Sequence, residues 1–221
     1  MSFVRTLNSI KNIQAELIKA GLSYDQNFPK TSEEAGYKEI GFANDNLISI
    51  ALSPIRYSDI YNELDRKKAF TIKLVDGALL QISYRFDRTT DKIISHRLGF
   101  FPKLDLIPWS EDEELYEKDN LFADILSGMV VHCPFRFDFN RNETAADHSK
   151  GHLTIGQIKD CRIPVSTPLS PGEFLGFIIG NLYSKAKANL PNELYTSSVD
   201  IEHFLVADDK KKFHMFAPVV D

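Results

Sequence analysis

The sequence has few cysteines and no long apolar run. Its two cysteines, Cys133 and Cys161, are too few for a secreted disulfide scaffold or for a zinc site built from cysteine alone. No stretch approaches the roughly 18 consecutive apolar residues that cross a bilayer. The first residues, MSFVR, lack the apolar segment of a signal peptide. We therefore expect a cytoplasmic protein with reduced thiols and no membrane association.

The motifs of the common cofactor sites are also missing. The chain has no phosphate-binding glycine loop of either common type, no nucleophile elbow, no Cys-x-x-Cys pair and no EF-hand loop. The net charge of −5 argues against a general nucleic-acid coat, which would carry a strong basic excess. A local basic site is still compatible with that charge. We expect neither a cofactor nor a bound metal.

The remaining composition is that of a folded domain. Hydrophobic residues make up 43% of the 221 positions and include 16 phenylalanines, enough for a sizeable core. Predicted strands come in runs instead of alternating with helices, which favours an antiparallel α+β fold over a doubly wound sheet. No flexible linker interrupts the chain. The prediction is one α+β domain over residues 1–221, with a sheet built from a meander and hairpins.

Helix signals occur at three places. Apolar residues recur every three or four positions over residues 3–20 and predict an amphipathic N-terminal helix. Ser58 opens a second, short helix. Ser170, followed by proline and then by Glu173, forms the N-cap and capping box of a long helix near residues 171–188. We expect the first and last of these helices to pack on the sheet.

The clearest strand signal is a hairpin. Two β-rich runs, residues 70–75 and 78–86, flank Asp76-Gly77, a preferred two-residue turn in which both residues need a positive φ. A third strand at residues 93–101 completes a meander. Further strands are predicted at residues 47–52, 130–140, 152–155, 162–165, 200–207 and 213–219, the last two as a closing hairpin.

Two other segments predict irregular or helical structure. The polar residues 24–37 include Asn27, Pro29 and Gly36 and predict a long surface loop. Ser110 with Glu113 fits a capping box and predicts a short helix over residues 111–116, in which the acidic run at residues 111–114 forms a solvated face. The alternative for this acidic run is an edge presented to a basic partner protein.

The candidate site depends on the two-residue period of strands. In residues 130–140 the period places the phenylalanines on one face and the polar residues on the other. If the next two strands pair with their apolar faces aligned, the opposite face gathers His132, Arg136, Asp138, His152, Thr154 and Arg162. Arginine, histidine and aspartate together can bind a phosphate or carboxylate and move a proton. The alternative is a solvated face with ordinary Arg–Asp pairs.

His148 and His152 raise a separate question. Their four-residue spacing would suit a zinc helix, but the intervening Ser-Lys-Gly is a poor helix and no glutamate follows His148. A pair acting as acid and base in metal-independent RNA cleavage would use the same histidines, with Arg136 or Arg162 neutralising phosphate. In a third interpretation, they hydrogen-bond loop carbonyls.

Several segments together resemble a known family. They are PFRFD at residues 134–138, HSKGHLTIG at 148–156, CRIPV at 161–165 and the proline-led helix that ends at Tyr183. This succession resembles the bacterial domain-of-unknown-function family 2290, which has no established activity. The resemblance implies a bacterial, cytoplasmic protein and draws attention to the arginine, aspartate and histidine positions without giving them roles. Such proteins often occur in multi-gene defence loci, an association and not a mechanism.

Three functional hypotheses follow. The first is a phosphate-recognising module, with RNA or DNA as ligand, that uses Arg136, Asp138, Thr154 and Arg162 within a multi-protein, phage-defence assembly. The second is a ribonuclease effector with His148 and His152 as catalytic residues. The third is a protein-binding subunit without catalysis, with an operon-encoded partner. Whether the chain is an enzyme stays open at this point.

Overall fold

The computed structural model describes residues 1–42, 55–104, 133–144, 149–158, 161–195 and 202–216. The helices are α1 (Phe3–Lys19), α2 (Tyr57–Arg66), α5 (Pro171–Leu182) and α6 (Ser184–Lys187), with short 3-10 helices η3 (Asn192–Tyr195) and η4 (Asp209–Lys211). The strands are β1 (Ser23–Gln26), β2 (Lys30–Glu34), β3 (Tyr37–Gly41), β4 (Ile72–Leu74), β5 (Leu79–Asp87), β6 (Ile93–Phe101), β7 (Phe135–Asn140), β8 (Gly151–Ile155) and β9 (Ile163–Pro164). The predicted strand at residues 47–52 and the acidic run at 111–114 lie outside the described residues.

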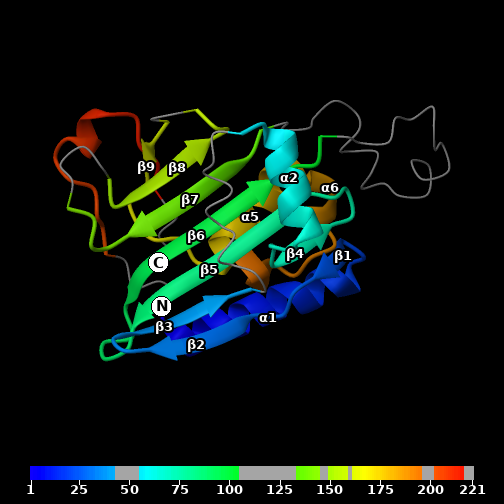
Figure 1. The fold of residues 1–221 in the computed structure, drawn as a ribbon, viewed down its shortest axis with the longest axis horizontal. Coiled ribbons are helices and arrows are strands. Elements are labelled where there is room, and N and C mark those ends of the chain that lie inside the picture. The colour runs from blue at the N-terminus through cyan, green and yellow to red at the C-terminus, as the bar shows by residue number, and fades with distance from the viewer. Residues whose placement is uncertain (43–54, 105–132, 145–148, 159–160, 196–201, 217–221) are drawn as a thin grey trace.

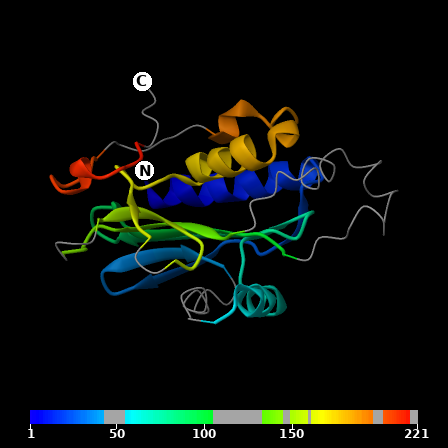
Figure 2. The same ribbon diagram turned by 90° about the horizontal axis from the view of Figure 1, so that it is seen from above.

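The elements form three layers. Helices α1 and α5 lie together on one face of the sheet, and α2 lies on the opposite face (Figures 1 and 2). The larger apolar cluster, which contains Leu17, Phe137 and Phe174, fills the space between the sheet and helices α1 and α5. A smaller cluster around Phe70 and Phe101 lies beneath α2. The predicted α+β architecture is confirmed.

The sheet is antiparallel and mostly follows the chain. Its order is β1-β4-β5-β6-β7-β8-β9, with β3 pairing β5 and β2 pairing β3. The meander of β4, β5 and β6 is confirmed, and β7, β8 and β9 continue it strand by strand. The long sequence gap between β6 and β7 therefore does not interrupt the sheet.

The capping box predicted for the long helix is present. The Ser170 hydroxyl accepts a hydrogen bond from the Glu173 N–H at 3.1 Å, and the Glu173 carboxylate accepts one from the Ser170 N–H at 2.6 Å. The predicted span is divided at Tyr183, whose φ of −133° and ψ of 56° lie outside the helical region. The Tyr183 hydroxyl donates to buried Asp76 at 2.7 Å, which ties the end of α5 to the β4–β5 turn.

The β4–β5 turn differs from the predicted two-residue turn. Only Gly77 has a positive φ, of 85°. The Leu74 N–H donates to the Ala78 carbonyl at 2.8 Å, and the Gly77 N–H donates to the Leu74 carbonyl at 2.9 Å. The loop therefore has three residues, with glycine at the left-handed position. Asp76 turns its carboxylate inward, where it also accepts the Ala78 N–H at 3.0 Å.

The surface loop predicted at residues 24–37 is wrong. This segment contains β1, β2 and the start of β3, which pair with β4, with each other and with β5. Every residue of β2 is exposed, and no residue of β1 is buried. Strands of this kind show no apolar alternation, because neither of their faces joins the core. The sequence pattern therefore lacked the signal that identifies a strand.

The prediction of a closing hairpin is also wrong for the part of it that the structure describes. Phe204 and Met215, one from each predicted arm, form backbone hydrogen bonds with the segment after β9. The Ser166 N–H donates to the Met215 carbonyl at 2.9 Å, and the Phe204 N–H donates to the Ser166 carbonyl at 2.8 Å. Both predicted arms therefore hydrogen-bond to Ser166 in the described part of the chain. The expected tight turn is the 3-10 helix η4.

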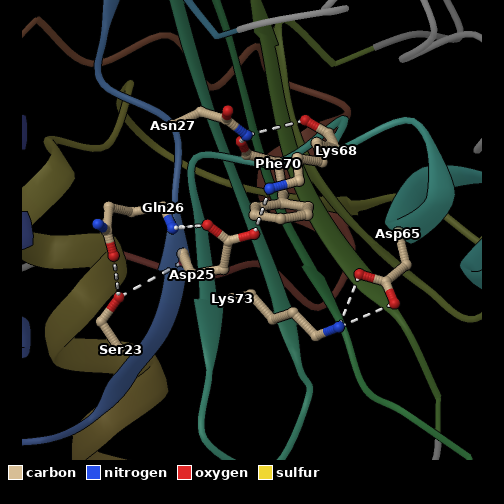
Figure 3. Close-up of polar contacts among 8 residues, drawn as sticks. All are labelled: Ser23, Asp25, Gln26, Asn27, Asp65, Lys68, Phe70 and Lys73. Carbon is tan, nitrogen blue, oxygen red and sulfur yellow. Dashed lines mark hydrogen bonds and ion pairs between the residues drawn. The ribbon is translucent and has the colours of Figure 1, made fainter.

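Ion pairs connect α2 to the edge of the sheet. Lys73 of β4 binds both carboxylate oxygens of Asp65 in α2 at 2.8 Å (Figure 3). Lys68, in the turn after α2, binds Asp25 of β1 at 2.9 Å. Asn27 donates to the carbonyls of Lys68 and Phe70 at 2.9 and 2.8 Å. Together these contacts hold β1, β4 and α2 in one arrangement.

Candidate functional site

Strand β7 brings the predicted polar residues together. It lies between β6 and β8, where Arg136 is opposite Thr154 of β8 and Asp138 is opposite both Arg97 of β6 and His152 of β8. Paired residues share a face of the sheet. The predicted convergence of Arg136, Asp138, His152 and Thr154 is therefore present in the structure.

The apolar side of β7 fixes this register. Phe135, Phe137 and Phe139 are buried in the main core, as the alternation predicts. The Phe137 ring makes edge contacts with Phe174 and Phe177 of α5 at centroid distances of 6.3 and 5.3 Å. A shift of one residue would turn the phenylalanines outward and bury the charged residues, so the core determines the position of the site.

Asp138 is the centre of the site. Its Oδ1 is 2.9 Å from Arg97 Nε, and its Oδ2 is 3.8 Å from Arg136 Nη2. The same Oδ2 is 4.0 Å from His152 Nε2. The Asp138 side chain is 17% exposed and that of Arg136 only 10%. One half-buried carboxylate is thus shared by two guanidinium groups and an imidazole.

Arg162 belongs to the same face. It lies two residues before Pro164, which pairs with His152, and its charge acts on that histidine. Unlike Arg136, Arg162 is exposed. We name the resulting set the arginine face: Arg97, Arg136, Asp138, His152, Thr154 and Arg162.

Gly99 leaves room for Arg136 to cross β6. The two residues are opposite each other, and a Cβ on Gly99 would lie 3.6 Å from Arg136 Cγ. The same Cβ would lie 2.6 Å from the ring of Phe101, closer than real Cβ contacts allow. A side chain at this position would force the ring to move. The glycine therefore allows the arginine stem and the Phe101 ring to lie side by side.

Arg136 is in an unfavourable environment for a cation. Burial lowers its pKa, the Asp138 carboxylate opposes this effect, and the Arg97 charge adds to it. An arginine stays charged despite such a shift. Its Nη1 is buried and has no hydrogen-bond partner among the described residues. A buried donor without a partner costs about 1–3 kcal/mol.

The surroundings of His152 favour its neutral form. Burial lowers its pKa, and the charges of Arg162 and Arg136 lower it further, against the opposing effect of Asp138. Its Nδ1 is buried, and a hydrogen bond with the Ser149 backbone also opposes the lowering of its pKa. A neutral imidazole beside a carboxylate can accept a proton or a hydrogen bond.

Other predicted site residues lie outside the described part of the chain. His132 and His148 are among them, so the pairing of His148 with His152 stays a prediction. Arg97 and Gly99 were not predicted. The alternation of the strand at residues 93–101 places Arg97 on a polar face, but nothing local indicates that this strand pairs with β7.

Among the described residues, no three His, Cys, Asp or Glu side chains are grouped to hold a metal ion. No helix in the described ranges has the length and apolar character to cross a membrane.

The comparisons with known proteins define the family. Residues 22–217 match the family described as Uncharacterized conserved protein (DUF2290). The chain belongs to this family. The matched range contains every residue of the arginine face and all strands of the sheet. Searches of curated proteins and of solved structures gave no match. DUF2290 membership confirms the resemblance seen in the sequence and assigns no activity.

Proposed function

We propose that this DUF2290 chain recognises a phosphate-bearing ligand, a nucleic acid, through the arginine face. The observation that supports the proposal is the buried guanidinium of Arg136, which shares one carboxylate with Arg97 and has an unpartnered Nη1 among the described residues. Two guanidiniums offer ten N–H donors, far more than Asp138 can accept. Phosphate oxygens are the acceptors that best match the arginine fork.

The overall charge sets how such binding behaves. The chain carries a net charge of −5, so it repels a polyanion at long range and attracts it only through a local site. Few phosphates are then neutralised. Binding should weaken only modestly as salt increases, because the salt dependence scales with the number of phosphate contacts. We also propose that the chain acts as a part of a larger, multi-protein assembly.

Two variants test the proposal, one of the buried Arg136 and one of the exposed Arg162. Binding of fluorescent single-stranded RNA and DNA oligonucleotides is measured by anisotropy for the wild type, Arg136→Gln and Arg162→Gln. Each substitution removes a positive charge that acts on the ligand, which should weaken binding by about five- to 150-fold. Arg162 is exposed, so its variant should unfold at the wild-type temperature.

Arg85→Gln is the matched control. Arg85 lies on the same face of the sheet, in β5, and is paired with Glu39 at 3.3 Å. Its replacement should leave binding unchanged. If the wild type binds these oligonucleotides no more tightly than Arg162→Gln does, the proposed recognition is wrong.

A ribonuclease is the second candidate, favoured by the 4.0 Å distance between His152 Nε2 and the Asp138 carboxylate. A neutral histidine near a carboxylate can act as a general base. This candidate requires RNA cleavage in the presence of EDTA that His152→Ala abolishes and Arg85→Gln does not. RNA that stays intact at high protein concentration excludes it.

A further inference from the structure

The charge of the arginine face indicates how many charges its ligand carries. With His152 neutral, the face contains three arginines, Arg97, Arg136 and Arg162, against one carboxylate, Asp138. The Asp138 carboxylate also opposes the lowering of the pKa of both Arg136 and His152. The described side chains of the face therefore have a local excess of two positive charges.

Three other cations in the described part of the chain contact carboxylates. On the same face, Arg85 is paired with Glu39 at 3.3 Å. At the ends of β6 and β7, Lys92 and Arg141 both bind Glu202 at 2.6 Å. The arginine face differs from these sites because its described residues include three arginines for one carboxylate.

Phosphate groups differ in charge in a way that fits this pattern. An internal phosphodiester carries one negative charge, whereas a terminal phosphomonoester carries about 1.5 to 2 at neutral pH and has three oxygens that accept hydrogen bonds. A dianion matches the local excess of two positive charges. Its oxygens can also reach several guanidinium donors at once, since each arginine presents its donors in a planar fork.

We propose that the arginine face binds the terminal phosphomonoester of a nucleic acid, and not an internal phosphodiester. Arg162 and Arg97 form the accessible part of this subsite, and the charge of Arg136 acts from beneath them. This inference rests on the proposed function and narrows it to a nucleic-acid end. The subsite would then distinguish a phosphorylated end from a hydroxyl end irrespective of base sequence.

The test compares RNA oligonucleotides of one sequence that differ only at their ends. One carries a 5′-phosphate, one a 3′-phosphate, and one hydroxyls at both ends, each with a fluorophore at an internal position. Affinities are measured for the wild type, Arg162→Gln and the control Arg85→Gln. The wild type and the control should bind one of the phosphorylated ends roughly tenfold or more tightly than the hydroxyl-ended RNA. Arg162→Gln should remove most of that preference.

The outcomes separate this inference from the proposed function. If the three RNAs bind the wild type equally and Arg162→Gln weakens all of them, the chain recognises internal phosphates and the inference is overturned, while the proposed function stands. If the ends make no difference and Arg162→Gln changes nothing, both are overturned. If inorganic phosphate competes with the phosphorylated RNA but not with the hydroxyl-ended RNA, that result would support the inference independently.

Discussion

His96 should make the fold sensitive to mild acid. It lies on the core side of β6, between the rings of Tyr84 and Phe139 at centroid distances of 5.5 and 5.6 Å. Its Nε2 accepts the Leu169 N–H at 3.0 Å, so the proton of the neutral ring is on Nδ1. The Tyr84 hydroxyl donates to the Leu169 carbonyl at 2.8 Å. Both backbone groups of Leu169, just before α5, thus depend on buried side chains.

The size of the effect follows from the pKa of His96. Burial lowers this pKa from its ordinary 6.5 to about 4. Because the unfolded chain binds the proton first, stability is complete above pH 6.5 and is lost as the pH falls from there to about 4. The loss amounts to about 2 kcal/mol at pH 5 and about 3 kcal/mol near pH 4.

The comparison with His96→Gln isolates this contribution. Glutamine keeps an oxygen acceptor for the Leu169 N–H but does not titrate. Free energies of unfolding are measured by urea denaturation, followed by circular dichroism, at about pH 8 and pH 5. The wild type should lose about 2 kcal/mol more than the variant between these pH values. Contributions of other groups, including His152, cancel in the difference.

His203→Gln is the control, since His203 is exposed. It should show the pH dependence of the wild type. If His96→Gln lost as much stability as the wild type over the same pH range, His96 would be as easily protonated in the folded protein as in the unfolded chain. The predicted acid sensitivity would then not come from this histidine.

Two further predictions concern packing near the site and at the end of the chain. Gly99→Ala should destabilise the fold by about 1–3 kcal/mol in urea denaturation, because the added methyl group overlaps the Phe101 ring; unchanged stability would contradict the tight crossing described above. Asp209→Asn should weaken the buried 2.6 Å hydrogen bond from Ser149 and expose residues 202–216 to limited proteolysis. Asp208→Asn, a neighbouring exposed position, is its control, and equal protease resistance of the two variants would contradict this role.

Much of the fold was predictable because local patterns and the core agree. The spacing of apolar residues gave α1, and the capping residues at Ser170 gave the start of α5. Alternation gave β5, β6, β7 and β8. The strands missed at residues 24–37 have polar side chains on both faces, so their pairing depends on backbone hydrogen bonds that leave no mark in hydrophobic periodicity.

The candidate site was predictable to the extent that neighbouring strands in the chain are neighbours in the sheet. Arg136, Asp138, His152 and Thr154 are on β7 and β8, which follow each other in the chain, so their convergence followed from the two-residue period. Arg97 and Gly99 belong to β6, separated from β7 by residues 102–134. No local signal specifies pairing over that distance. The burial of Arg136 could likewise not be predicted from the sequence, because it results from the pairing of β6 with β7.

The segment beside β9 has a consequence for self-association. Ser166 uses its N–H on Met215 and its carbonyl on Phe204, while the Met215 N–H donates to Pro164. An outermost strand with unused backbone groups is a template for pairing with another copy. Here the chain's own residues 202–216 occupy those groups. A second molecule could add a strand at this edge of the sheet only by displacing residues 202–216, which belong to the same chain as the edge.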